Sequence, residues 1–209
     1  PSEEVRLLLG RLVRNMVARV LDSGSPTQLA PYFSDAVFLA LSASVDPFPD
    51  AKLAGMRLLS LLCARVPVGL KMFAVGLVKQ MVPALTHRLS RVRIGAMHCV
   101  SALVMCEDKA KCRGAGSAAI VDLIGHRDAN VIPTAAFYFG EARVNSFAKL
   151  VLDSNAGVRY EFVEAMGTWM HDLPDRCDHH GRLVPYMLSM LSDASPRVQA
   201  RALHWMERL

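Results

Sequence analysis

Apolar residues recur along this chain with the spacing of an amphipathic helix, and the same spacing returns in five windows. Counted from the first apolar residue of a window, large apolar side chains fall at offsets 0, 4, 5, 8, 11 and 12. Most of these offsets lie on one side of a helix with 3.6 residues per turn. The windows start at Val5, Ala51, Val92, Val158 and Val198, and the window from Val158 carries Phe162, Val163, Met166, Trp169 and Met170. Each window therefore predicts a helix that buries one apolar stripe.

Between these windows lie second apolar segments, so the pattern predicts two antiparallel helices per unit. The step from Val158 to Val198 is 40 residues. A two-helix unit that returns at a fixed step is typical of solenoids built from helical repeats. The sequence therefore predicts an all-α fold, an α-solenoid of helical hairpins that forms a single array over residues 1–209. The expected repeats lie near 2–45, 46–89, 90–152, 153–192 and 193–209, and the last of them is incomplete.

The third unit is longer than its neighbours, since the step from Val92 to Val158 is 66 residues. We expect the excess to form an insertion at about 106–145 that is less regular than its flanks, because it contains Gly114, Gly116 and Pro133. In the unit before it, Pro83 predicts a kink or a break in the second helix.

Two polar positions repeat together with the apolar ones. One residue after the window start the chain has Arg6, Lys52, Arg93, Arg159 and Gln199, and five residues before it the chain has Asp46, His87, Asp153 and Asp193. An aspartate in the turn and a cation in the first helical turn can hydrogen-bond between neighbouring units. We therefore expect these residues to form a ladder along the stack, with the aspartates also placed favourably ahead of helix N-termini.

This combination of an Asp–Val–Arg/Lys ladder and paired helices resembles the HEAT-repeat family, and the resemblance covers nearly the whole chain. The segments 46–50 (DPFPD), 173–180 (LPDRCDHH) and 183–188 (LVPYML) are similar to the HEAT-repeat type of axonemal dynein assembly factor. The resemblance implies a non-catalytic scaffold in the cytoplasm that helps to preassemble dynein arms. It also implies protein partners, namely dynein subunits or other assembly factors and chaperones.

Composition argues against several other classes of function. Charged residues or prolines interrupt every long apolar run, so we expect no membrane span. The net charge is +5, but the cations are spread along the repeats, which favours a mildly basic surface over a nucleic-acid site. The odd count of five cysteines is typical of reduced thiols in a reducing compartment. Because the chain starts with Pro1 and ends on half a hairpin, we expect it to be a piece of a longer protein.

Motifs for catalysis are weak. Cys177, His179 and His180 could supply a metal ligand, but zinc needs three or four converging ligands and no second pair with ligand spacing exists. No His-Glu pair occurs that would match the iron site of HEAT-fold deoxyhypusine hydroxylases. The segment Gly114–Ser117 lacks the remainder of a phosphate loop, and no Gly-x-Ser-x-Gly occurs.

We therefore expect no enzyme activity and no catalytic, cofactor-binding or metal-binding residues, and we expect protein binding on the solenoid surface. Two alternatives remain open at this point. One is a general HEAT adaptor, such as a transport receptor or a phosphatase scaffold, and the other is an enzyme with a metal centre between Cys177 and His180.

Overall fold

The described part of the chain consists of helices joined by short turns. The computed structural model describes residues 2–23, 26–70, 73–108, 147–173 and 176–209, and no strand occurs among them. The elements in chain order are α1 (Glu3–Asp22), η1 (Pro26–Tyr32), α2 (Phe33–Ser44), α3 (Pro49–Arg65), α4 (Pro67–Leu70), α5 (Ala74–Met81), η3 (Val82–Thr86), α6 (Ser90–Asp108), η5 (Ala148–Leu152), α9 (Ala156–Asp172), α10 (Arg176–Met190) and α11 (Pro196–Met206), where η denotes a 3-10 helix.

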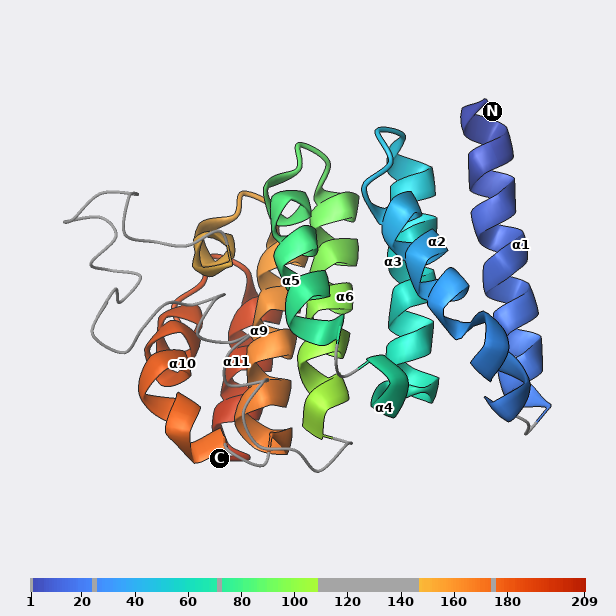
Figure 1. Ribbon diagram of the computed structural model, residues 1–209. Coiled ribbons are helices and arrows are strands. Elements are labelled where there is room, and N and C mark those ends of the chain that lie inside the picture. Colours follow the sequence, from blue (N-terminus) through green and yellow to red (C-terminus); the bar gives the residue numbers. More distant parts are fainter. Residues whose placement is uncertain (1, 24–25, 71–72, 109–146, 174–175) are drawn as a thin grey trace.

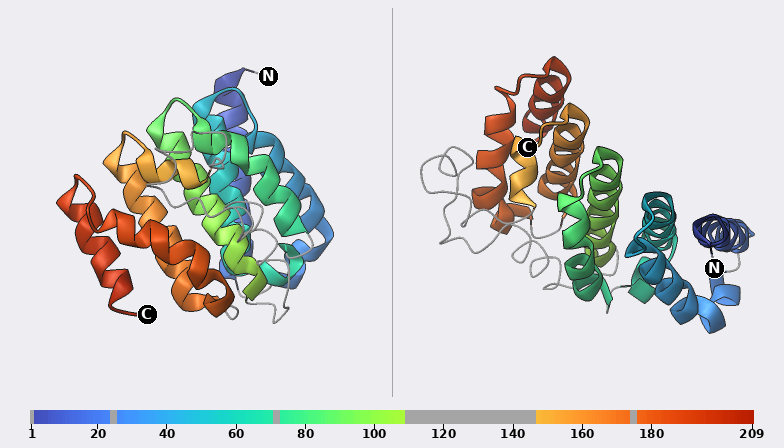
Figure 2. Two further views of the ribbon diagram at one scale, coloured as in Figure 1. Left: turned by 90° about the vertical axis from the view of Figure 1, so that its left-hand side faces the viewer. Right: turned by 90° about the horizontal axis from the view of Figure 1, so that it is seen from above.

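The helices form two layers, and the five sequence windows correspond to the helices of one layer. In this layer α1, α3, α6, α9 and α11 stack side by side in chain order (Figure 1). The second layer contains α2, α5 and α10. Helix α2 packs mainly against α3 and α5 against α6, each the first helix of the following unit, whereas α10 packs mainly against α9 of its own unit. Seen from above, the array bends, and the first helices lie on the inside of the bend (Figure 2). The prediction of an all-α solenoid of helical hairpins is confirmed.

Local sequence signals explain where several helices start and stop. The Ser2 hydroxyl accepts a hydrogen bond from the Val5 amide at 3.4 Å and so caps α1. Helix α3 begins with Pro49, which is tolerated in a first turn because its missing N–H has no helical partner there. In the second unit α5 ends at Met81 and the chain continues as the 3-10 helix η3, which contains Pro83. The break expected at this proline is confirmed.

The core is one apolar cluster that runs through the stack. All six apolar residues of the fourth window are buried, and Trp169 has no exposed surface. Its indole stacks on the ring of Phe147 with 5.1 Å between centroids, and Phe147 contacts Phe162 at 5.2 Å. Phe147 is the first described residue after Asp108. Its ring contacts with Phe162 and Trp169 attach the start of this segment to α9.

The first window departs from the expected pattern. Its stripe should be buried, but Val5, Leu9 and Met16 have 52%, 49% and 58% of their surface exposed. Among the described residues, helix α1 has a neighbouring first helix on one side only, and it meets α3 through Gly10, where an added Cβ would lie 3.3 Å from Cβ of Ala54. The template assumes a neighbour on both sides, so the expectation is wrong for that half of the stripe.

At the other end of the array, Trp205 of α11 is more buried than the sequence pattern predicts. The half-built last hairpin predicts that Trp205 lacks a packing surface, yet Trp205 is only 7% exposed. Its indole packs against α9 at Gly167, where any Cβ would overlap the ring. Because glycine has no side chain, the indole can lie directly on the helix backbone.

The interval in the third unit leaves the stack continuous. Helix α6 extends to Asp108, so the first residues of the expected insertion are helical, and Cys106 is buried with its Sγ 3.4 Å from the carbonyl oxygen of Cys63. The rest of the expected insertion lies outside the described residues. Helix α6 packs directly on α9, so the two first helices are neighbours despite their separation in sequence.

Candidate binding surface

Three of the four predicted rungs of the ladder are present, and each joins one unit to the next. Arg6 pairs with Asp46, Arg93 with Asp153, and Arg159 with Asp193. Each arginine donates through two nitrogens to the two carboxylate oxygens, at 2.6 and 3.2 Å, 2.6 and 2.7 Å, and 2.6 and 2.9 Å respectively. Such paired, charge-assisted hydrogen bonds fix both the distance and the orientation of neighbouring helices.

Three residues at the cation position of the ladder also close the turn of their own unit. Arg93 donates to the carbonyl oxygen of His87 at 2.8 Å, Arg159 to that of Asp153 at 2.7 Å, and Gln199 to that of Asp193 at 2.5 Å. Gln199 therefore keeps the carbonyl contact of the ladder position without its charge.

The turn acid has its own local contact as well. The carboxylates of Asp46, Asp153 and Asp193 each accept a backbone N–H two residues on, at 2.8, 2.8 and 2.7 Å. This contact holds the turn in the shape that leads into the next first helix.

The position of Lys52 and His87 is an exception to the expected ladder. No ion pair joins these two residues within the described chain. The ring Nδ1 of His87 accepts the Leu89 amide at 3.1 Å, the contact that a carboxylate makes in the other turns. Partial burial lowers the pKa of His87, and the positive charges of Lys52 and Arg88 lower it further. A neutral imidazole thus replaces the turn acid locally but cannot attract the lysine.

Two rungs are shielded from solvent on both sides, Arg93–Asp153 and Arg159–Asp193, and the second has the less exposed aspartate. The side chains of Arg159 and Asp193 are 14% and 3% exposed. The guanidinium of Arg159 holds the pKa of Asp193 below its usual range, although burial opposes this. In the rung at the start of the chain the Arg6 side chain is 34% exposed, and the hydrogen bond from Arg6 likewise lowers the pKa of Asp46. We conclude that the ladder is structural, because its polar atoms are used to hold the units together.

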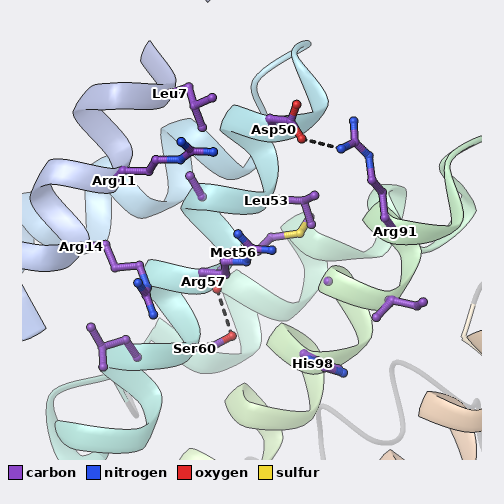
Figure 3. Close-up of a pocket in the computed structure, with 14 residues that line it drawn as sticks. Leu7, Arg11, Arg14, Asp50, Leu53, Met56, Arg57, Ser60, Arg91 and His98 are labelled. Atoms are coloured by element: carbon purple, nitrogen blue, oxygen red, sulfur yellow. Dashed lines mark hydrogen bonds and ion pairs between the residues drawn. The ribbon is translucent and has the colours of Figure 1, made fainter. Parts of the chain in front are cut away.

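A groove that the ladder contacts do not fill lies on the surface at the inside of the bend. This groove has a volume of about 760 Å³ and runs across α1, α3 and α6 (Figure 3). We call it the arginine groove, after Arg11 and Arg14 of α1, Arg57 of α3 and Arg91 of α6. Leu53, Met56 and Ile94 contribute apolar lining between these cations.

Three of the four arginines have no acidic partner among the described residues. Arg91 donates to Asp50 at 2.7 Å, the only carboxylate of the lining. Arg11 and Arg14 extend from α1 towards α3, and Arg57 is exposed on α3 itself (Figure 3). Four arginines and one aspartate give the lining a net charge of +3, against +5 for the whole chain. The expectation that the cations are spread along the repeats is therefore wrong for α1, α3 and α6.

The neighbouring part of the same surface carries the opposite sign. A smaller groove of about 290 Å³ between α6 and α9 is lined by Glu161 and Glu164. His98 lines both grooves and lies 2.7 Å from Glu161, which raises the pKa of His98. Glu164 forms a two-point ion pair with Arg201 of α11. These acids are therefore already engaged with cations, unlike the three arginines.

A signal for this surface was present in the repeat itself. Six residues after the window starts the chain has Arg11, Arg57, His98, Glu164 and His204. All of these but His204 line one of the two grooves. The offset thus identifies a row of side chains across successive first helices, with arginine on α1 and α3, histidine on α6 and α11, and glutamate on α9.

The candidate metal ligands Cys177, His179 and His180 do not converge in space. Cys177 to His180 lie inside α10 rather than in a loop, where Cys177 is exposed, His179 is buried and His180 contacts the Met170 carbonyl oxygen at 3.2 Å. Across the described ranges no three His, Cys, Asp or Glu side chains gather in a geometry that could hold a metal ion. None of the described helices is long and apolar enough to cross a membrane.

The match to one known protein family covers nearly all of this chain. The family model described as "Dynein axonemal assembly factor 5-like, TPR repeats" matches residues 1–117 and 129–209. TPR units are about 34 residues long, whereas a step near 40 is typical of HEAT repeats, and both are stacks of helical hairpins. The step of this chain and its ladder agree with the HEAT type.

Three curated relatives align with the chain at low identity. Dynein axonemal assembly factor 5 of Xenopus laevis is 23% identical over 208 residues, and that of Mus musculus is 24% identical over 209 residues, each covering 100% of this chain. The protein of the same name from Homo sapiens is 22% identical over 174 residues and covers 83% of the chain. The chain spans about a fifth of the length of the relatives from Xenopus and mouse, 21% of each.

Proposed function

Because this chain belongs to the Dynein axonemal assembly factor 5-like family, we propose that it is a protein-binding section of a factor that preassembles axonemal dynein arms. The observation that carries the proposal is the family match, which extends over both ends of the helical array. Relatives of the same name align with the chain over its full length or most of it.

The architecture supports a scaffold. A stack of helical hairpins in which every unit contacts its neighbours presents an extended surface of fixed shape. Here three rungs of the ladder hold neighbouring units together, and the row of first helices presents a basic and an acidic groove side by side. Such a surface suits the binding of protein partners with complementary charge.

The chain acts without catalytic turnover in this proposal. The grooves are lined by arginines, by acids that already pair with cations, and by apolar side chains. Hydrolysis or group transfer would need a nucleophile with a base in contact, or a bound metal. The described part of the grooves contains neither arrangement, and the proposal requires no cofactor.

We place the binding in the cytoplasm, where dynein arms would be assembled before transport to the axoneme. The expected partners are dynein subunits, other assembly factors and chaperones. Membranes and nucleic acids are not among them.

The experiment is affinity purification of the whole tagged protein from the cytoplasm of flagellated cells after the flagella are removed. Quantitative mass spectrometry should find axonemal dynein chains enriched over an untagged control, together with assembly factors or chaperones. Enrichment of nuclear-transport cargo or phosphatase subunits with no dynein chain would instead support a general HEAT adaptor.

A further inference from the structure

We propose that the arginine groove binds an acidic, amphipathic segment of a partner protein, laid across α1, α3 and α6 as a helix. This proposal rests on the protein-binding function proposed above and adds the chemistry of the segment and its place on the array. The observation behind it is that Arg11, Arg14 and Arg57 line one hollow without an acidic partner in the described chain.

Charge complementarity selects an anionic occupant. Unpaired guanidiniums that gather on one surface repel one another, and a carboxylate can bind two nitrogens of a guanidinium at once. Two other arginines on the same face are already neutralised, since Arg201 pairs with Glu164 and Arg91 with Asp50. The groove therefore brings together three described arginines that lack an acidic partner among the described residues.

The apolar lining selects a protein segment over a small phosphate compound. Leu53, Met56 and Ile94 lie between the cations, so an occupant gains by burying apolar side chains there. Phosphate sites usually use the free N–H groups of a helix N-terminus. Of the lining residues only Asp50 and Arg91 belong to a first helical turn, so the groove offers few free backbone donors.

The same lining argues against single-stranded nucleic acid. Such ligands stack their bases on Phe, Tyr or Trp while basic residues follow the backbone. The groove contains none of these three aromatic residues. An amphipathic helix with leucines on one face and glutamates beside them matches both features of the groove, in the helix-in-groove mode of recognition.

The size of the groove sets the length of the probe. Packed helices lie about 8–10 Å apart, so crossing from α1 to α6 takes about 20 Å, or roughly 13 residues of helix. We would use a fluorescein-labelled helical peptide of about 20 residues with Leu on one face and Glu on the other. Matched peptides carry Gln or Lys in place of every Glu.

The test measures fluorescence anisotropy of these peptides with the full chain. The Glu peptide should bind, and the Lys peptide should not. The triple variant Arg11→Glu, Arg14→Glu and Arg57→Glu should weaken binding of the Glu peptide by about tenfold or more, because close charge pairs across an interface couple strongly. Raising the salt concentration should weaken wild-type binding, since rim charges are screened.

A matched triple variant controls for overall charge. Arg19→Glu, Arg88→Glu and Arg176→Glu change three other exposed arginines by the same total and should leave the affinity within about twofold. The neutral triple Arg11→Gln, Arg14→Gln and Arg57→Gln should give an intermediate loss. This variant keeps the test valid if charge reversal disturbs folding, which circular dichroism would report.

Three results would overturn the proposal: no binding of the Glu peptide, equal loss in the groove and control triples, or tighter groove-dependent binding of a single-stranded RNA of about 20 nucleotides. The last result would assign the groove to nucleic acid. None of these results affects the affinity purification of the whole protein described above, so failure of the groove and failure of the scaffold function can be told apart.

Discussion

Replacing Arg159 with methionine tests whether the ladder holds the array together. Methionine keeps most of the aliphatic stem and removes the guanidinium. Asp193, whose side chain is only 3% exposed, then loses both hydrogen bonds from Arg159 and keeps only the Ser195 amide at 2.7 Å. A carboxylate shielded from water is left without its counter-charge.

The expected loss of stability follows from that burial. Breaking a buried ion pair by removing one partner typically costs 3–5 kcal/mol, because the remaining charge is desolvated and unpaired. In the wild type Arg159 is itself partly exposed to water, and in the variant the Asp193 carboxylate keeps one backbone donor. We therefore expect a loss of about 2–4 kcal/mol. The matched change Arg6→Met removes the same contact at the more exposed rung and should cost less.

The dependence on pH provides a second criterion. Arg159 lowers the pKa of Asp193, so the rung contributes stability above the unfolded value of about 3.9. That contribution is lost as the pH falls through the lower folded value. The difference between wild type and Arg159→Met should therefore shrink in acid. Urea unfolding followed by circular dichroism measures it at neutral pH and below pH 4. A loss no larger than that of Arg6→Met, or one that does not change with pH, would refute the role given to the ladder.

Four further changes test the packing and the exceptional turn. Trp169→Ala should cost about 3–5 kcal/mol in urea unfolding, because the indole is fully buried. Gly167→Ala should destabilise the chain by overlap with the indole packed there, whereas Gly76→Ala, which meets no atom within 4 Å, should stabilise it by about 0.5–1 kcal/mol. His87→Asp should raise the melting temperature at pH 7, since a carboxylate can accept the turn amide and also pair with Lys52. A lower melting temperature would contradict our account of that turn.

The repeat register predicted most of the fold because it depends on local periodicity. The five first helices follow from the apolar offsets, and three rungs of the ladder follow from an arginine and an aspartate at fixed places in successive units. The register did not reveal that the Lys52 and His87 position lacks an ion pair. Only the contact of the His87 ring with the Leu89 amide explains the residue in that turn.

The candidate site could be predicted only in part, since it depends on neighbours in space. Arg11, Arg57 and His98 occupy the same offset in three windows, and that coincidence places them in one row. The hollow between them depends on how closely α1, α3 and α6 approach, which the spacing of residues does not give. Likewise, the exposure of Val5 on α1 depends on the absence of a described neighbour on that side.

The most direct test of the central claim is removal of the whole protein from a flagellated cell. We expect immotile flagella whose axonemes lack dynein arms in electron micrographs, together with unstable dynein heavy chains in the cytoplasm, and re-expression of the protein should restore both. Normal arms on the axonemes of depleted cells, alongside a defect in nuclear transport or phosphatase targeting, would contradict the account.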